Sequence, residues 1–173
     1  LQGLKMHGGV AESEIREPNA EGVVKGFANL DRHIANLQAF GQSVVVCFNR
    51  YAQDTEEEIE LVRRHCAQVG VPFALNEAFL KGGEGAEELA RLVVETIENE
   101  PSGELCYACA RSSDIKSKIE AVARKVYGAS SIKFSSTASK KIKMLEEAGY
   151  STLEVCIAKT QYSFSQNPKA YGA

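Results

Sequence analysis

The sequence has 173 residues, of which 44% are hydrophobic and 25% are charged, as in an ordinary globular protein of about one domain. Its formal net charge of −3 argues against nucleic acid as the main partner, since nucleic-acid-binding proteins usually carry a strongly basic patch. No apolar run approaches the roughly 18 residues of a membrane-spanning helix, and residues 1–9 lack a signal-peptide pattern. We therefore expect a cytoplasmic protein that binds neither membranes nor nucleic acid.

The two ends of the chain and its cysteines bear on its context. The chain opens with Leu1 instead of Met and closes on a turn-rich segment, 167–173, so we expect a piece of a longer protein. The five cysteines are scattered, which indicates reduced thiols. Cys106 and Cys109 form a C-x-x-C pair. A redox pair, half of a zinc site and a coincidental pair at a strand end are all open interpretations, although no second pair of zinc ligands is suitably spaced.

The first part of the chain predicts a loop and a helix. Residues 1–18 contain two adjacent glycines and Pro18, a composition typical of loops. Residues 19–40 predict a helix ending at Gly41, because apolar residues recur at steps of three and four. The side chains expected on its apolar face are those of Val23, Phe27, Leu30, Ile34, Leu37 and Phe40.

Strands and helices then alternate along the chain. Residues 43–48 form a short continuous apolar run rich in β-branched residues, which is typical of a parallel strand covered on both faces. A helix capped by Asp54 or Thr55 follows and stops at Gly70, with acidic residues at its positive end. Residues 71–75 predict a second short strand.

The remaining patterns predict more helices than strands. Residues 86–98 predict a helix with Leu89, Leu92, Val93 and Ile97 facing inward, because these apolar residues share one face. The segments that follow predict a weak strand at 105–108, helices near 113–127 and 137–148 that end at Gly128 and Gly149, and a last strand at 154–158.

This alternation predicts an α/β fold with a mostly parallel sheet flanked by helices. Ligands of such sheets gather at the loops that follow the carboxyl ends of the strands. Three loops occupy that position here, at residues 49–55, 76–85 and 159–165. The sequence therefore places its candidate binding site among them.

The first of these loops carries residues suited to a flat, polar ligand. Asn49 can present both a carbonyl and an NH2 group at the strand end, which suits the edge of a base or a pterin. Tyr51 offers a flat face for stacking. A plain connection between a strand and a capped helix is the alternative, and the residues alone favour it.

The second loop is rich in glycine and contains Lys81, Gly82, Gly83, Glu84 and Gly85. Glycines allow a ligand to approach the backbone closely, and the helix that follows would direct its amides at an anion. The chain has no G-x-x-x-x-G-K-[ST] motif, so this is not the phosphate loop of P-loop proteins. A surface turn remains the alternative.

Two further segments contain hydrogen-bond donors, but neither supplies a catalytic set. Lys5 and His7 lie beside two glycines, and residues 159–163 follow the last predicted strand. The composition of neither segment identifies a ligand. The chain has no G-x-S-x-G or H-E-x-x-H motif. The residues alone thus indicate an α/β domain with a ligand site at its strand ends.

Taken in order, these segments resemble the formate–tetrahydrofolate ligase family along nearly the whole chain. The resemblance implies a protein about three times longer, with a P-loop NTPase-like fold, an added subdomain and an ATP-binding P-loop outside this chain. The motifs that carry it are Leu4-Lys5-Met6-His7-Gly8-Gly9, Asn29-Leu30-Asp31-Arg32-His33-Ile34, Val44-Val45-Val46-Cys47-Phe48-Asn49-Arg50, Lys81-Gly82-Gly83-Glu84-Gly85 and Cys156-Ile157-Ala158-Lys159-Thr160-Gln161-Tyr162-Ser163.

The resemblance also implies a reaction. Formate attacks the γ-phosphate of MgATP to give formyl phosphate, and the N10 amine of tetrahydrofolate then attacks the formyl carbon and expels phosphate. Mg²⁺ and the P-loop would neutralise the charge on the phosphates. The family is usually oligomeric, so we expect a homo-oligomer. We expect this chain alone to be inactive.

The same resemblance implies a role for this chain on the folate side of the site. The family holds the pterin between a Phe-Pro pair, which falls on Tyr51 and Ala52, and a Trp, which falls on Phe79. Asn49 and the 81–85 loop are further candidates for ligand hydrogen bonds. Residues 1–100 would form the α/β portion with these loops, and residues 101–173 a helical subdomain returning to a sheet strand. An inactive folate-binding or interaction module is the alternative.

Overall fold

The computed structural model describes residues 1–111, 113–158, 164 and 167 of the chain, and two parallel strands form the only sheet in this part. Strand β1 (Val46–Asn49) pairs with strand β2 (Phe73–Asn76), and helix α3 (Glu56–Gln68) connects them. The register places Val46 opposite Phe73 and Asn49 opposite Asn76. This β–α–β unit confirms the prediction of an α/β fold with parallel strands, and both strands lie within three residues of their expected bounds.

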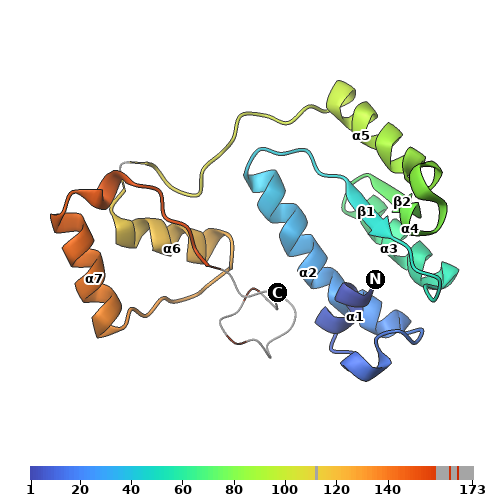
Figure 1. Ribbon diagram of the computed structural model, residues 1–173, viewed down its shortest axis with the longest axis horizontal. Helices are drawn as coiled ribbons and strands as arrows, with labels where there is room; N and C mark the ends of the chain where they lie inside the picture. Colours follow the sequence, from blue (N-terminus) through green and yellow to red (C-terminus); the bar gives the residue numbers. More distant parts are fainter. Residues whose placement is uncertain (112, 159–163, 165–166, 168–173) are drawn as a thin grey trace.

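The predicted helices are all present. They are α2 (Ala20–Ala39), α3, α5 (Glu87–Asn99), α6 (Ile115–Lys125) and α7 (Ser136–Glu147). Helices α2, α6 and α7 end beside Gly41, Gly128 and Gly149, which all adopt positive φ angles, as the glycine signals predicted. Figure 1 shows the sheet and α5 on one side of α2 and the pair α6 and α7 on the other, joined by the extended segment that follows α5.

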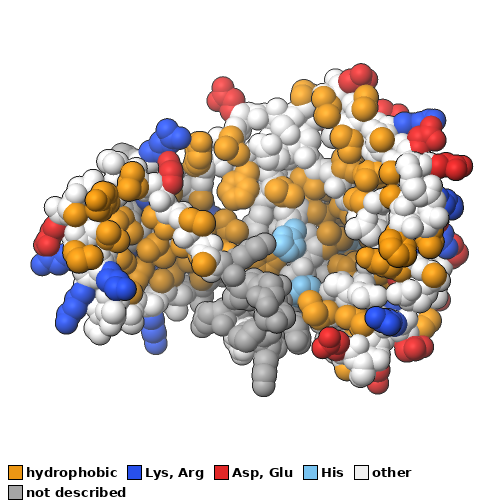
Figure 2. All heavy atoms as spheres, viewed as in Figure 1, with side chains coloured by type: hydrophobic (Ala, Val, Ile, Leu, Met, Phe, Trp, Pro, Cys, Tyr) orange, Lys and Arg blue, Asp and Glu red, His pale blue; other side chains and the backbone are white. Residues whose placement is uncertain are grey.

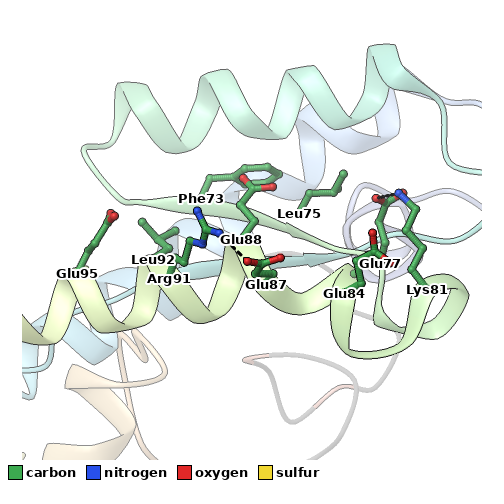
Figure 3. A pocket seen from close by; sticks show the side chains of 11 residues that line it. Phe73, Leu75, Glu77, Lys81, Glu84, Glu87, Glu88, Arg91, Leu92 and Glu95 are labelled. Carbon is green, nitrogen blue, oxygen red and sulfur yellow. Dashed lines mark hydrogen bonds and ion pairs between the residues drawn. The ribbon is translucent and has the colours of Figure 1, made fainter.

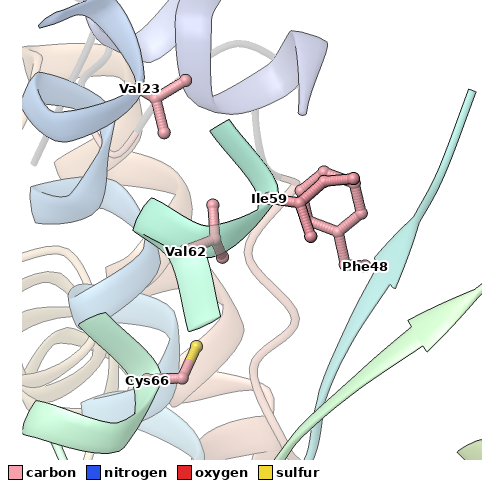
Figure 4. Packing of buried hydrophobic residues seen from close by; sticks show 5 residues of the cluster. All are labelled: Val23, Phe48, Ile59, Val62 and Cys66. Carbon is pink, nitrogen blue, oxygen red and sulfur yellow. The ribbon is translucent and has the colours of Figure 1, made fainter. Parts of the chain in front are cut away.

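The buried core lies between α2, α3 and one face of the sheet (Figure 4). Val23 on α2 and Ile59, Val62 and Cys66 on α3 are at most 2% exposed, and Phe48 on β1 packs against them. This matches the apolar face predicted for α2, apart from Leu37, which is 46% exposed. The core therefore fixes the carboxyl end of β1 against the first turns of α3.

Strand β1 is covered on one face only, so the prediction of burial on both faces is wrong. Phe48 is 4% exposed, whereas its neighbours Cys47 and Asn49 point to the opposite face and are exposed. The physical reason is that α2 and α3 cover the Phe48 face, while α5 packs against β2 rather than β1. The exposed end of that second face carries Asn49.

The first 18 residues are more ordered than predicted. They contain helix α1 (Gln2–His7) and a 3-10 turn, η1 (Glu12–Glu14), where the sequence predicted a loop. Leu1 and Leu4 pack against the core, and Lys5 is 1% exposed. Because packing on α2 stabilises this short helix, local propensity gave no signal of it.

Two predicted strands are absent from the described part of the chain. Residues 105–108 and 154–158 have no ladder partner, although Cys106 N–H donates to Phe40 O at 3.0 Å. Lys118, which is 2% exposed, instead holds the segment before residue 154 by donating to Ser151 O and Leu153 O at 2.7 and 3.0 Å. An extended segment becomes a strand only where another strand pairs with it.

Helix α5 exposes part of the face that was predicted to point inward. Leu89 and Leu92 are half-buried, but Val93 is 39% and Ile97 is 64% exposed. Figure 2 shows hydrophobic side chains open to solvent where α5 lies at the upper right. The inward prediction is therefore right for the turns that meet β2 and wrong for the following turns, which extend past the end of the short strand.

Candidate functional site

The carboxyl ends of the two strands bring two asparagines together. Asn49 and Asn76 are register partners, and Asn76 Nδ2 donates to Asn49 Oδ1 at 2.8 Å. Asn76 Oδ1 accepts from the backbone N–H of Ala78 at 3.1 Å. The side-chain oxygen of Asn49 is therefore bonded to Asn76. Asn49 lies on the exposed face and can present its NH2 group there as a donor.

The register continues for one residue beyond the strands as an ion pair. Arg50 N–H donates to Asn76 O at 2.9 Å, and Arg50 Nη1 lies 3.4 Å from Glu77 Oε1. Arg50 Nη2 also bonds to Glu56 on the first turn of α3. The side chains of Arg50 and Glu77 are 26% and 18% exposed, so this pair is partly shielded from water.

Two aromatic rings follow the ion pair. The Tyr51 and Phe79 ring centroids lie 6.2 Å apart with an interplanar angle of 50°. Tyr51 is 42% exposed and Phe79 is 83% exposed. The structure therefore brings together the two aromatic residues that were singled out from the sequence, on separate loops. Ala52, beside Tyr51, is exposed and offers only a methyl group.

The loop that carries Tyr51 is held by the cap of helix α3. Asp54 Oδ2 accepts from Tyr51 N–H at 2.9 Å, and Asp54 is 6% exposed. Thr55 caps the helix in a reciprocal capping box with Glu58, as the sequence predicted for this position. The backbone of Tyr51 is consequently anchored to a buried side chain, while its ring stays accessible.

The glycine-rich segment is a helical turn rather than an open loop. Helix α4 (Ala78–Lys81) and the 3-10 turn η2 (Gly82–Ala86) lead directly into α5. Lys81 Nζ bonds to Glu77 Oε2 at 2.6 Å. The Lys81 hydrogen bond, with the charges of Lys81 and Arg50, lowers the pKa of Glu77 below its ordinary value despite the opposing effect of burial. Glu77 is therefore ionised at neutral pH and engages Lys81.

Acidic side chains at the start of α5 disfavour the binding of an anion there. Its first turn carries Glu87 and Glu88, which already occupy the positive end of the helix dipole. Gly82 and Gly83 are exposed and lead into this turn. The segment thus has the glycines expected of an anion loop, but its charges do not favour one.

A cavity of about 580 Å³ lies along β2 and α5 (Figure 3). Its walls combine two apolar side chains of β2 with mainly acidic side chains. The lining residues are Phe73, Leu75, Glu77, Lys81, Glu84, Gly85, Glu87, Glu88, Arg91, Leu92 and Glu95. Asn49, Tyr51 and Phe79 do not line it, so the predicted folate-contacting side chains form a separate, more exposed surface.

Gly85 provides a test of the packing of this turn. A Cβ atom at Gly85 would lie 2.5 Å from the Glu77 carbonyl carbon, whereas one at Gly83 would meet nothing within 4 Å. We expect Gly85→Ala to displace residues 77–85 and to weaken ligand binding, and Gly83→Ala to have little effect. Thermal unfolding and tetrahydrofolate binding of the two variants would show this, and equal behaviour would contradict it.

The candidate segment around Lys5 has a structural role. Lys5 Nζ lies 2.7 Å from Glu58 Oε1, and both side chains are 1% exposed. Lys5 also donates to Glu17 O at 2.8 Å, and Asn19 N–H donates to Glu58 Oε1 at 2.7 Å. Lys5 is thus buried and fully engaged, and it is not placed to meet a phosphate. The candidate segment 159–163 lies outside the described residues.

Ionisation of Glu58 is favoured by its partners. Burial acts to raise the pKa of Glu58, but hydrogen bonds from the Asn19 N–H, the Lys5 ammonium and Thr55 outweigh it and place the pKa below its ordinary value. The buried network is therefore charged at neutral pH and joins α1, the start of α2 and the cap of α3.

The remaining candidates are the paired cysteines. Cys106 is exposed and Cys109 is half-buried, and both are free thiols. Over residues 1–111, 113–158, 164 and 167, no group of three or more His, Cys, Asp or Glu side chains is arranged to hold a metal ion. No helix in these ranges is long and apolar enough to cross a membrane.

Sequence reasoning missed Glu77 and Asn76 as parts of this site. The signal was present in the two strand endings, Phe48-Asn49-Arg50-Tyr51 and Leu75-Asn76-Glu77-Ala78-Phe79. Each ends with an Asn followed by a residue of opposite charge to its counterpart, and an aromatic residue comes next in the first ending and one residue later in the second. In a parallel pair the two asparagines face one another, so the parallel register brings together the amides and the ion pair that follows them, while Phe79 reaches Tyr51 from α4.

Comparison with known proteins shows the family of the chain. The chain matches the family profile described as formate–tetrahydrofolate ligase over residues 1–173. It is 58% identical over 171 residues to the formate–tetrahydrofolate ligase of Parabacteroides distasonis, 57% identical over 172 residues to that of Bacteroides thetaiotaomicron and 44% identical over 173 residues to that of Campylobacter concisus. Each match covers 99% of this chain and 31% of the relative's length. The resemblance seen in the sequence is confirmed: the chain belongs to the formate–tetrahydrofolate ligase family.

Proposed function

We propose that the protein takes part in the ATP-dependent ligation of formate to tetrahydrofolate, through formyl phosphate, and that this chain contributes the folate-binding side. Family membership supports the reaction. The observation that carries the folate assignment is the contact of the Tyr51 and Phe79 rings, 6.2 Å apart, at the carboxyl ends of two parallel strands. Open α/β sheets bind ligands at that edge.

The rings of Tyr51 and Phe79 suit a flat heterocycle, provided that they move apart. Aromatic layers stack at about 3.5–4 Å, so a pterin held between two rings needs roughly 7–8 Å between their centroids. The rings are 6.2 Å apart and tilted by 50°, and they therefore touch each other. Phe79 is 83% exposed on a four-residue helix, so a small movement of that helix admits the ligand.

Polar contacts would orient the ring between Tyr51 and Phe79. Asn49 is exposed two residues before Tyr51, and Asn76 Nδ2 donates to its carbonyl oxygen. A donor in that position suits a carbonyl or ring nitrogen acceptor of the pterin. The folate N10 amine could then reach a formyl phosphate bound outside this chain, attack its carbon and expel phosphate.

MgATP does not fit the residues described here. The chain has no P-loop motif, the described residues form no acidic or histidine cluster for a metal, and the first turn of α5 is acidic. We assign the ATP phosphates and Mg²⁺ to a P-loop part of the protein beyond this chain. We further propose that the whole protein has a P-loop NTPase-like fold, in which residues 1–100 belong to the α/β portion and residues 101–173 to the added subdomain. We also propose that it is a homo-oligomer of the cytoplasm.

A second candidate is a folate-binding or interaction module without catalytic activity. It is favoured by the departures from the family's commoner residues, since Tyr51-Ala52 stands in place of Phe-Pro and Phe79 in place of Trp. It is also consistent with Lys81 being engaged by Glu77. The two candidates differ in turnover and share folate binding.

A segment exchange separates the two candidates. This chain would replace the matching 171 residues of the Parabacteroides distasonis ligase, to which it is 58% identical. We expect the chimera to form ADP and 10-formyltetrahydrofolate, and its Tyr51→Ala variant to show a raised KM for tetrahydrofolate. A chimera that binds tetrahydrofolate without turnover would favour the module. An unchanged KM in the Tyr51→Ala variant would contradict the folate assignment.

A further inference from the structure

One carboxylate connects the two loops of the candidate site. Glu77 Oε1 lies 3.4 Å from Arg50 Nη1 on the Tyr51 loop, and Glu77 Oε2 lies 2.6 Å from Lys81 Nζ at the end of α4. Its backbone N–H donates to Gly85 O at 2.9 Å. Figure 3 shows Glu77 and Lys81 joined by a dashed line at the end of the cavity away from Leu92. Glu77 is thus the point at which both ring-bearing segments meet.

Helix α4 has few other constraints. It spans four residues, has no side-chain cap and contains no buried residue. A single helical turn is unstable without tertiary contacts. The position of Phe79, in the middle of this turn, therefore depends on the bonds made by its neighbours, which are those of Glu77 and Lys81 and the hydrogen bond from Ala78 N–H to Asn76 Oδ1.

We propose that Glu77 is a positioning residue for the folate site, because its carboxylate holds Arg50 and Lys81 together and thereby sets the separation of the Tyr51 and Phe79 rings. This inference rests on the proposed function. Glu77 itself does not touch the pterin. The Glu77 carboxylate keeps α4 against the end of β1. The two rings therefore border a narrow slot and do not move independently of one another.

Neutralising Glu77 breaks the connection without removing bulk. In Glu77→Gln, the amide nitrogen cannot accept a hydrogen bond from Arg50 or Lys81, so only one of the two partners can stay bound. The freed partner returns to solvent, α4 loses one of the side-chain bonds that hold it, and the ring of Phe79 samples a wider range of positions. A misplacement of about 1 Å in a binding group can cost two orders of magnitude in reactivity, so the effect on folate use is measurable.

The test is steady-state kinetics on the complete natural polypeptide that carries this sequence. We expect Glu77→Gln to raise the KM for tetrahydrofolate by about tenfold, with the KM for ATP, the KM for formate and kcat at saturating folate each within about twofold of wild type. Glu77→Asp, which keeps the charge, should give an intermediate KM for tetrahydrofolate. A rise in all three KM values, or none, would overturn the inference.

Glu87→Gln is the matched control. Glu87 Oε1 bonds to Arg91 Nη2 at 2.5 Å on the surface of α5, and both residues line the same cavity as Glu77. The substitution is chemically identical, but it affects neither ring-bearing segment. We expect all three KM values of this variant to match wild type, and a raised folate KM here would point to the charge of the cavity instead of loop positioning.

The outcome also distinguishes this inference from the proposed function. If Tyr51→Ala and Phe79→Ala leave the KM for tetrahydrofolate unchanged, the folate assignment fails. If both raise it and Glu77→Gln does not, only the positioning role fails.

Discussion

Replacing Phe79 by alanine is expected to weaken tetrahydrofolate binding by about 5- to 150-fold, because stacking of one heterocycle on an aromatic ring contributes roughly 1–3 kcal/mol. The same change should leave the free energy of unfolding within about 0.5 kcal/mol of wild type, since the Phe79 side chain is 83% exposed. Isothermal titration of tetrahydrofolate and urea unfolding of the complete natural polypeptide measure the two quantities.

Phe48 supplies the matched control for that experiment. It undergoes the same Phe→Ala change three residues before Tyr51, but its side chain is 4% exposed and packs in the core. We expect Phe48→Ala to lower the free energy of unfolding by about 3–5 kcal/mol. If Phe79→Ala were as destabilising as Phe48→Ala, its effect on binding would reflect unfolding, and the assignment of Phe79 as a ligand contact would lose its support.

Removing the buried carboxylate of Glu58 is expected to lower the free energy of unfolding by about 3–5 kcal/mol, because it leaves the Lys5 ammonium buried without its counter-ion. Both side chains are 1% exposed, and Glu58 also completes the capping box of α3. Urea unfolding of Glu58→Ala measures the loss. A double variant, Lys5→Met with Glu58→Met, removes both charges and should recover most of the stability.

Acid should have the same effect as this substitution. A carboxyl group whose pKa is lowered by folding stabilises the fold fully above its unfolded pKa of about 4.3 and loses that contribution as the pH falls through its folded value. The pKa of Glu58 is lowered, so stability should decrease below about pH 4. The double methionine variant should show a smaller decrease, and an equal one would assign the acid sensitivity to other carboxylates.

Periodicity was sufficient to predict the elements that form the core. The apolar residues of α2 and α3 recur at helical spacing over 20 and 13 residues, and the caps at Thr55 and Gly41 mark their ends. These signals are local, because a helix forms its hydrogen bonds within one segment. The β–α–β unit then follows from two short apolar runs on either side of a helix.

Elements that depend on distant partners were harder to predict. Helix α1 is six residues long and depends on packing against α2, which its own residues do not reveal. Residues 154–158 have the composition of a strand but no partner among the described residues. The inward prediction for Ile97 assumed a covering layer that the short strand β2 does not provide.

The candidate site was predicted in part. Tyr51 and Phe79 were identified through the resemblance, and the structure brings their rings together. Asn76 and Glu77 were missed, since their importance comes from the parallel register that aligns them with Asn49 and Arg50. To recognise them, one has to know which residues of the two strands lie opposite each other, and no single segment of the sequence gives that pairing.

The shared register of β1 and β2 also limits how this part of the protein can vary in evolution. Two side-chain pairs, one of amides and one of ions, follow from a single alignment of the two strand ends, and the rings of Tyr51 and Phe79 meet just beyond them. An insertion or deletion of one residue within 46–49 or 73–76 would shift the pairing register and move strand side chains to the opposite face of the sheet. Length changes among natural relatives should therefore fall outside these two segments, for example in the turn after α3, where the chain can lengthen without moving either strand.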